Sequence, residues 1–205
     1  MDTPRRRTQA DRSATTRTKI LAAVVQCVDE LGLAGTTSQA IAGSAGVTVG
    51  AVQHHFASKA DVLRAVLEDS FDRLSEGFEG APVEDSLEDR VSVFIDRAWL
   101  HYGSVRFRST LEIVLSAREL RGATDWARGP IAESSARARR LWDSFFADSG
   151  IPEPQQRELL RFSFVTLSGM AMTTRLSGDA TTQVELLKSS LVALLRDAMK
   201  QTRAN

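Results

Sequence analysis

The chain has 205 residues, of which 42% are hydrophobic, so it is long enough to bury a hydrophobic core without disulfide bonds or structural metal ions. Its 26 basic and 26 acidic residues cancel overall, yet up to Arg64 eight basic residues stand against five acidic ones. The lone Cys27 excludes an internal disulfide, and no segment approaches the roughly 20 consecutive apolar residues of a membrane span. A polyanion is therefore expected at the basic N-terminal end of a soluble, cytoplasmic protein that contacts no membrane.

Residues 1–14 are predicted to form a basic, flexible arm that contains the run Arg5–Arg7. In one interpretation this arm reaches a DNA groove or backbone, and in the other it only solubilises the chain. From Thr16 to Leu31 the apolar residues recur every three or four positions, which predicts an amphipathic helix. Gly32 is expected to end that helix.

The next segment predicts two very short helices around a glycine turn. Thr37 or Ser38 can cap the first helix, Gly46 supplies the turn, and Thr48 is placed to cap the second. A longer helix is predicted after Ser58 and ends near Gly80. Together these elements define a predicted DNA-binding domain over residues 15–68.

Residues 69–205 are predicted to form a second, helical domain. The apolar pattern predicts helices from Leu87 to Trp99, around Leu111 to Leu115, from Trp126 to Phe146, from Gln155 to Leu176 and from Thr181 to Lys200. Gly129 and Pro130 are expected to kink or restart the third of these. No alternating strand pattern occurs, so the predicted fold class is all-α, with about nine helices.

The two short helices favour a helix-turn-helix, whose second helix enters the major groove of DNA. Val52 and Phe56 share the face that must be buried, and Gly50 and His54 lie on the opposite face. Lys59 adds its charge at the start of the next helix, where it is expected to hold a phosphate. The predicted DNA-binding residues are Thr37, Ser38, Gln39, Thr48, Val49, Gly50, Ala51, Gln53, His54, His55 and Lys59.

The adjacent pair His54 and His55 also raises the alternatives of a metal site or acid–base chemistry. Neighbouring helix positions diverge by about 100°, whereas paired metal ligands need a spacing of three or four. No carboxylate or nucleophile lies near the pair in sequence, and no phosphate-binding loop or nucleophile elbow occurs elsewhere. The prediction is therefore a protein with no catalytic residues, no metal site and no cofactor.

The segment "ILAAVVQCVDELGLAGTTSQAIAGSAGVTVGAVQHHFASKADVLRAV" resembles the N-terminal domain of the tetracycline-repressor (TetR) family of bacterial transcriptional regulators. One departure is Gln53, which stands where that family usually has a phosphate-contacting tyrosine. The resemblance implies a homodimer that binds an inverted-repeat DNA operator through one recognition helix per subunit. It also implies a C-terminal domain that carries the dimer interface and binds a small-molecule effector, which releases the DNA.

Candidate pocket and interface residues lie in the C-terminal part. Large aromatic and sulfur-containing side chains predict a pocket lined by Trp99, Tyr102, Trp126, Trp142, Phe145, Phe162 and Met170, with ordinary core as the alternative. Small residues within an apolar helix favour a close helix crossing, either between subunits or within one chain. The predicted dimer interface comprises Phe164, Ser168, Gly169, Leu187, Leu191 and Leu194. Four polar residues of these helices are expected at the surface, with the anchoring of a charged ligand by one of them as the alternative, namely Arg106, Arg108, Glu112 and Arg175.

The resulting hypothesis is a ligand-responsive transcriptional regulator, acting as a repressor, and not an enzyme. Two rival hypotheses remain open on the sequence. One is a helical enzyme or ligand carrier whose basic N-terminal part is incidental. The other is a dimeric ligand-binding or interaction protein without specific DNA recognition.

Overall fold

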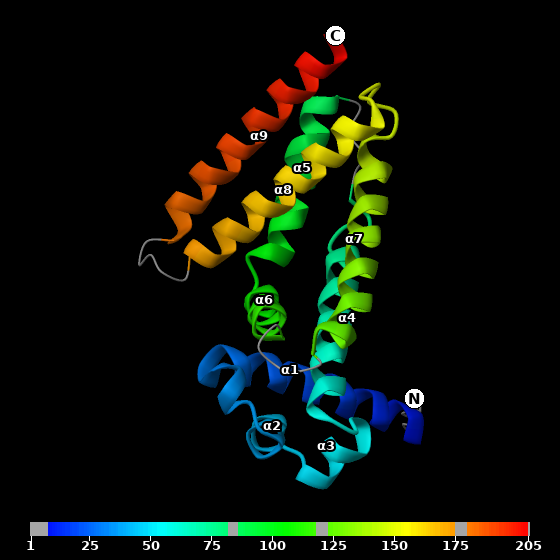
Figure 1. The fold of residues 1–205 in the computed structure, drawn as a ribbon, viewed down its shortest axis with the longest axis vertical. Helices are drawn as coiled ribbons and strands as arrows, with labels where there is room; N and C mark the ends of the chain where they lie inside the picture. The colour runs from blue at the N-terminus through cyan, green and yellow to red at the C-terminus, as the bar shows by residue number, and fades with distance from the viewer. Residues whose placement is uncertain (1–7, 82–85, 118–122, 175–179, 205) are drawn as a thin grey trace, which may run out of the picture. The chain divides into compact units, whose positions relative to one another are not determined.

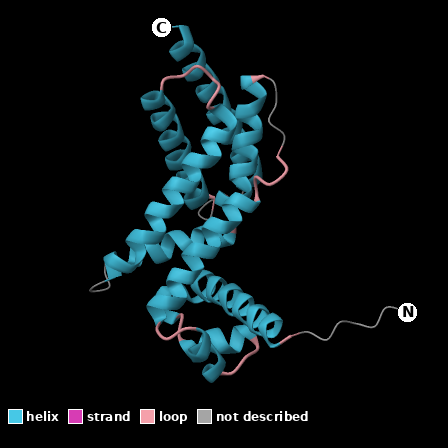
Figure 2. Cartoon of the chain, turned by 90° about the vertical axis from the view of Figure 1, so that its right-hand side faces the viewer, coloured by secondary structure: helices cyan, strands magenta, loops and turns pink. Residues whose placement is uncertain are grey.

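The structure, a computed structural model, describes residues 8–81, 86–117, 123–174 and 180–204 (Figures 1 and 2). Nine α-helices and no β-strand occur within these residues, which confirms the predicted all-α fold. The described residues form two compact units, one of residues 8–68, 109–117 and 123–128 and the other of the remainder. The functional division at residue 68 stays a prediction, and the N-terminal unit also includes chain segments from beyond it.

The N-terminal unit is built on four helical segments whose apolar faces converge. They are α1 (Gln9–Gly35), α2 (Ser38–Ala45), α3 (Val49–His55) and the first half of α4 (Lys59–Glu76). Ile20 and Val24 of α1, Ile41 of α2 and Leu63 of α4 are at most 2% exposed. Burial of these four side chains fixes the short helices against α1, because each contributes about 1.5–3 kcal/mol when removed from water.

Helix α1 begins at Gln9, well before the predicted start at Thr16. The Thr8 hydroxyl accepts a hydrogen bond from the Asp11 N–H, and the Asp11 carboxylate accepts one from the Thr8 N–H. This reciprocal capping box satisfies two backbone donors. The first turns contain no apolar stripe, so periodicity alone could not locate them. Gly32 ends the regular helix as predicted, with a φ of 70°.

Five further helices follow along the chain, and the C-terminal unit comprises the described residues of 69–108 and 129–204. Their bounds are α5 (Leu87–Tyr102), α6 (Val105–Ala117), α7 (Ala123–Phe146), α8 (Glu153–Thr173) and α9 (Ala180–Ala204). Helix α7 continues through Pro130 without a restart. Helices α8 and α9 run side by side in opposite directions, and both contact α5 (Figure 1). No helix in the described ranges is long and apolar enough to cross a membrane.

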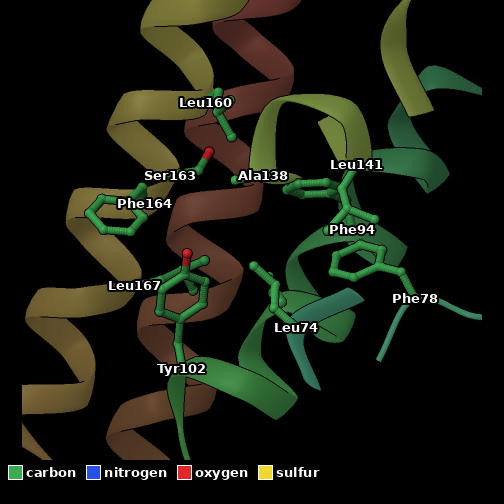
Figure 3. A pocket seen from close by; sticks show the side chains of 11 residues that line it. Leu74, Phe78, Phe94, Tyr102, Ala138, Leu141, Leu160, Ser163, Phe164 and Leu167 are labelled. Carbon is green, nitrogen blue, oxygen red and sulfur yellow. The ribbon is translucent and has the colours of Figure 1, made fainter. Parts of the chain in front are cut away.

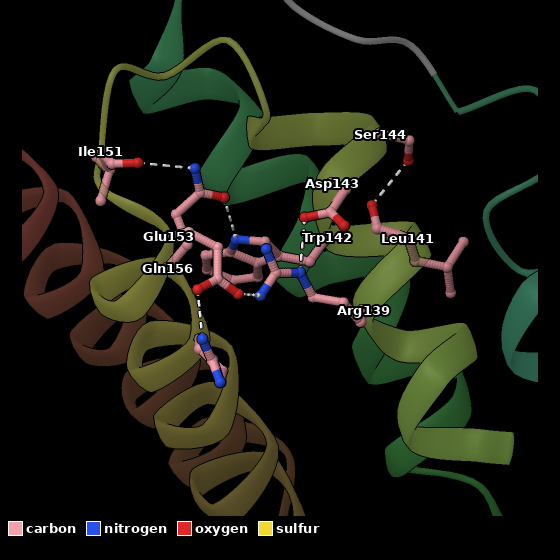
Figure 4. Close-up of polar contacts among 9 residues, drawn as sticks. Arg139, Leu141, Trp142, Asp143, Ser144, Ile151, Glu153 and Gln156 are labelled. Atoms are coloured by element: carbon pink, nitrogen blue, oxygen red, sulfur yellow. Dashed lines mark hydrogen bonds and ion pairs between the residues drawn. The ribbon is translucent and has the colours of Figure 1, made fainter. Parts of the chain in front are cut away.

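Aromatic rings in edge-on and tilted contacts form the core of the C-terminal unit. The Phe94 ring lies 5.1 Å from that of Phe78 and 5.3 Å from that of Trp142, measured between centroids. Trp142 donates a hydrogen bond to the Gln156 amide oxygen at 3.2 Å, and the Gln156 amide nitrogen donates to the Ile151 carbonyl at 2.9 Å (Figure 4). These two bonds join α7 to the start of α8 and satisfy the buried polar groups.

Candidate functional site

The turn between α2 and α3 is fixed by local hydrogen bonds. The Thr37 hydroxyl accepts from the Ala40 N–H at 3.1 Å, so Thr37 and not Ser38 caps α2. Gly46 adopts the left-handed conformation, with φ 64° and ψ 37°, which a residue with a side chain rarely takes. The Thr48 hydroxyl then accepts from the Ala51 N–H at 3.1 Å and starts α3.

Helix α3 separates a buried face from an exposed one. Val52 is 4% exposed and Phe56 is 7% exposed, as the helix-turn-helix prediction requires. Gly50, Gln53 and His54 are exposed on the other side. A Cβ at Gly50 would meet only the Thr48 hydroxyl oxygen, 3.9 Å away. The fold of this chain therefore does not require glycine there, and the start of α3 is bare enough for another molecule to approach closely.

The two histidines at the end of α3 contact each other edge to face. Their ring centroids lie 5.6 Å apart in an edge-on arrangement, and the His55 ring also tilts against Phe56. His54 is exposed and His55 is half-buried. No group of three or more potential metal ligands occurs among the described residues. The histidines thus form part of the α3 surface.

A basic residue of α1 belongs to the same surface. The guanidinium carbon of Arg17 lies 5.4 Å from the centroid of the Phe56 ring, within the range of a cation–π contact. Arg17 is exposed, so its charge stands beside the end of α3 and remains available to an anion. Sequence reasoning did not select Arg17, because the contact joins residues 39 positions apart along the chain.

Lys59 has a partner within the N-terminal unit. Its ammonium nitrogen donates to the Leu33 carbonyl oxygen at 2.8 Å. The Leu33 N–H donates to the Glu112 carboxylate at 3.0 Å. Glu112 was expected at the surface as a free polar side chain, but it is half-buried and anchors the chain after Gly32. Both polar groups of the Leu33 backbone are thus satisfied by side chains from other helices.

The predicted DNA-binding residues lie together on the α2–turn–α3 segment and at the start of α4. Nine of them are exposed, namely Thr37, Ser38, Gln39, Thr48, Val49, Gly50, Gln53, His54 and Lys59. Ala51 and His55 are half-buried. Arg5–Arg7 of the predicted arm lie outside the described residues. The structure thus gathers the set on one small unit, and its contact with DNA stays a prediction.

The C-terminal unit contains a separate apolar cavity of about 20 Å³ (Figure 3). Four helices and the chain after α4 line it, with side chains Leu74, Phe78, Phe94, Ala98, Tyr102, Ala138, Leu141, Leu160, Ser163, Phe164 and Leu167. Only Tyr102 and Ser163 of these carry a polar group. The lining has the mostly apolar character with a few polar groups that is usual for ligand sites, but the volume is far below the roughly 300–1,000 Å³ of such sites.

The predicted pocket residues divide between cavity, core and surface. Tyr102 lines the cavity, whereas Trp142, Phe145 and Met170 are buried and Phe162 is 44% exposed. Trp99 is half-buried beside Gly103, and the Trp126 side chain lies outside the described residues. None of these residues other than Tyr102 lines this cavity. Leu74, Leu141 and Leu160 were missed because leucines at helical spacing look the same in a core and in a pocket wall.

The residues predicted for a dimer interface also divide. Leu187 is 36% exposed and Leu194 is 57% exposed, but Leu191 is buried inside the chain at 2%. Phe164 lines the cavity, where its ring meets the edge of Tyr102 at 5.8 Å, and part of it stays exposed. Ser168 is half-buried and Gly169 is exposed.

Two other residues that were expected at the surface are partly withdrawn from it. The Arg106 guanidinium pairs with the Asp69 carboxylate at 2.5 Å, with 16% of its side chain exposed. Arg108 is half-buried and donates to the Gly103 carbonyl at 3.1 Å. The surface prediction was wrong for both, because each guanidinium has an intrachain acceptor, although the Arg108 Nε is buried without a hydrogen-bond partner. Arg175 lies outside the described residues.

The N-terminal unit matches a known protein family in sequence. A family model described as "Bacterial regulatory proteins, tetR family" matches residues 20–66. The HTH-type transcriptional regulator CymR of Pseudomonas putida is 24% identical over 195 residues, which cover 95% of this chain and 96% of that protein. The family model therefore spans the later part of α1, all of α2 and α3 with the turn between them, and the first part of α4.

Solved structures share the fold along nearly the whole chain. GusR of Salmonella enterica superposes with a TM-score of 0.68 at 18% identity, over 94% of this chain and 98% of that one. A TetR family transcription regulator from Marinobacter aquaeolei superposes with a TM-score of 0.65 at 19% identity, over 93% and 98%.

The helix-turn-helix unit and these matches define a DNA-binding transcriptional regulator, a class of proteins that are not enzymes. Residues 20–66 thus match the TetR family of bacterial regulatory proteins, and the described fold is shared with solved members of that family.

Proposed function

We propose that the protein is a ligand-responsive repressor, which binds an inverted-repeat operator as a homodimer and leaves it when a small molecule binds. The observation that carries the proposal is the exposed face of α3, on which Gly50 near its start and His54 near its end both lie at the surface. An α-helix fits the major groove, and side chains near its start meet the base edges. We further infer that the protein acts in the cytoplasm, where its DNA is.

The polar residues of this surface support a division of roles. Gln53 and His54 present hydrogen-bonding groups beside Ala51, whose methyl group can contact thymine. Arg17 and Lys59 carry positive charge at the two flanks and suit phosphate contacts, which position the protein without reading sequence. Gln53 replaces a bulkier tyrosine of the family, and its amide still suits a phosphate or a base.

An exposed apolar stripe supports the homodimer. Phe162, Val165, Gly169 and Met172 follow one face of α8 at spacings of three or four, and the three large side chains among them are 44–60% exposed. A Cβ at Gly169 would meet no described atom within 4 Å. The intrachain helix crossing considered for Gly169 is thus not seen in the described part of the chain. Leu186, Leu187 and Leu194 of α9 are exposed as well. Apolar surface of this kind marks an association site, and a second copy can cover it.

The small molecule is assigned to the cavity between α5, α7 and α8 in the C-terminal unit. Its lining is apolar, and Tyr102, predicted from sequence as a pocket residue, forms part of the wall. A ligand can shift the DNA affinity only if it binds the DNA-free conformation more tightly than the bound one. The proposal therefore requires that ligand binding lowers the affinity for the operator and that operator binding lowers the affinity for the ligand.

Selection from random duplex DNA tests the proposal. The full chain should enrich an inverted repeat, and binding to that repeat should weaken steeply between about 50 and 200 mM salt because phosphate contacts release counterions. A His54→Ala, Gln53→Ala double variant is the matched control, since both side chains are exposed and their removal leaves the fold intact. No duplex preference at low salt would favour the alternative, a dimeric ligand-binding or interaction protein without specific DNA recognition.

A further inference from the structure

One hydroxyl group in the cavity wall has no partner inside the protein. Tyr102 is 5% exposed, and no hydrogen bond joins its hydroxyl to another described residue. Figure 3 shows the Tyr102 ring rising from α5 with its oxygen toward Leu167 of α8. Because no described residue uses this hydroxyl, it can donate and accept a hydrogen bond when a ligand enters the cavity.

The second polar group of the cavity wall, the Ser163 hydroxyl, already donates its hydrogen bond within the protein. The Ser163 hydroxyl donates to the Leu159 carbonyl at 2.8 Å, which leaves its oxygen able to accept one hydrogen bond. Tyr102 can both donate and accept. The wall therefore offers one complete hydrogen-bonding position, the Tyr102 hydroxyl, which can donate and accept. It also offers one weaker position, the Ser163 oxygen, which can only accept, and the other nine lining side chains are apolar.

Resting on the proposed ligand-responsive function, we infer that the cavity takes a small, uncharged, ring-containing molecule with one neutral polar group, which hydrogen-bonds to the Tyr102 hydroxyl. The aromatic wall favours a ring, since Phe94, Tyr102 and Phe164 offer ring edges and faces. The single complete hydrogen-bonding position limits the ligand to one polar group inside the cavity.

The charge of the surroundings explains why the ligand is uncharged. No charged side chain lines the cavity, so a buried carboxylate or ammonium would lose its hydration without a counter-charge. His101 packs edge-on against Tyr102, and burial together with the charge of Arg106 lowers its pKa to about 4. His101 is therefore neutral near pH 7. Arg106 is paired with Asp69, and Arg108 points to the Gly103 carbonyl.

The size of the cavity shows what the ligand has to do on entry. A volume of about 20 Å³ holds one water molecule at most, and that water would find few polar partners. When an apolar group of a ligand displaces a poorly ordered water, the ligand gains affinity. A ring is larger than this space, so the α8 wall, which supplies Leu160, Phe164 and Leu167, has to move away from α5 and α7. This movement is the step at which binding can change the conformation of the protein.

Four probes of nearly the same shape test the ligand class: acetophenone, ethylbenzene, benzoate and benzamidinium. Each is titrated by NMR into the full-length protein without DNA. Acetophenone, which is neutral and accepts a hydrogen bond, should bind with a Kd of about a millimolar, as expected for nine heavy atoms in an apolar site. Ethylbenzene should bind about three- to tenfold more weakly because it lacks the acceptor. Benzoate and benzamidinium should bind at least about thirtyfold more weakly than acetophenone.

Tyr102→Phe is the matched variant, because it removes only an oxygen that no described residue contacts. It should weaken acetophenone binding by about three- to tenfold and leave ethylbenzene binding and thermal stability unchanged. A charged probe that binds as tightly as acetophenone, equal acetophenone affinity in Tyr102→Phe, or no acetophenone binding at about 10 mM would each overturn the inference.

The inferred ligand class and the proposed regulatory function are tested by separate measurements, so either one can be refuted without the other. Probe binding is measured without DNA, and operator release is measured by adding acetophenone to the protein–operator complex. Binding without release would refute the regulatory link and leave the ligand class standing. Release by benzoate and not by acetophenone would refute the ligand class and leave the ligand-responsive function standing.

Discussion

The ammonium group of Lys59 holds the carbonyl oxygen of Leu33 at 2.8 Å, across 26 positions of sequence. The bond joins the start of α4 to the chain after Gly32, where α1 loses its helical conformation. An ammonium group has three donors, so Lys59 can keep this bond and still contact a phosphate. The same side chain is therefore expected to stabilise the fold and to bind DNA.

Lys59→Ala should lower the free energy of unfolding by about 1 kcal/mol, because the Leu33 carbonyl loses its donor. It should also weaken binding to every duplex alike and reduce the salt slope by about one, as the loss of one phosphate contact requires. Urea denaturation measures the first effect, and a salt series of DNA titrations measures the second.

Arg64→Ala is the control for Lys59→Ala. Arg64 also lies on α4, but its partners Asp61 and Glu68 are exposed neighbours on the same helix. Its removal should change the free energy of unfolding by less than about 0.5 kcal/mol. If Lys59→Ala altered the preferred sequence and kept the affinity, Lys59 would be a base-reading residue and the phosphate role would be wrong.

His54→Ala and Ala51→Ser should change base preference instead of overall affinity. A base contact made by either side chain is worth about 1–3 kcal/mol at one position of each half-site. Binding to a panel of operators with single base changes measures this effect, and each substitution should flatten the preference at one position. Equal losses on all operators would place these residues on the phosphates.

Local chemistry explains which parts of this site the sequence predicts. Thr37, Gly46 and Thr48 act within five residues of themselves, through caps and a left-handed turn, so their residue types alone locate α2 and α3. The spacing of Val52 and Phe56 likewise predicts which face of α3 is buried.

Contacts between distant positions explain what the sequence does not predict. The bond from Leu33 to Glu112 spans 79 positions, and the contact of Arg106 with Asp69 spans 37. Periodicity places such residues on a helix but does not name the partner that withdraws them from solvent. The pocket shows the same limit: Phe162 and Phe164 are two positions apart on α8, and only packing shows that Phe164 is the one that lines the cavity.

Gly169→Leu should impair dimerisation by at least about tenfold in the dissociation constant, because a branched side chain would hold the two apolar stripes apart. Leucine favours a helix by up to about 1 kcal/mol over glycine, so loss of the dimer would not reflect unfolding of α8. Sedimentation velocity over a concentration series measures the effect.

Gly129→Leu is the control for Gly169→Leu. Gly129 is also exposed within a helix, and a Cβ there would meet no described atom within 4 Å, but it lies on α7 outside the apolar stripe. Its substitution should leave the dimer unchanged. An intact dimer in Gly169→Leu would remove α8 from the proposed interface.

Acid should destabilise the protein through His101. This side chain is 7% exposed, and burial together with the charge of Arg106 lowers its pKa from 6.5 to about 4. Between these two values the unfolded chain binds a proton that the folded chain does not, so the free energy of unfolding falls as the pH falls. The contribution is fully present above pH 6.5, is lost progressively toward pH 4, and amounts to about 3 kcal/mol at most. His101→Gln should remove this part of the pH dependence, whereas His54→Gln should retain it because His101 is intact. Urea denaturation at intervals from pH 4 to pH 7.5 measures the slope, and an identical slope in wild type and His101→Gln would show that another group is responsible.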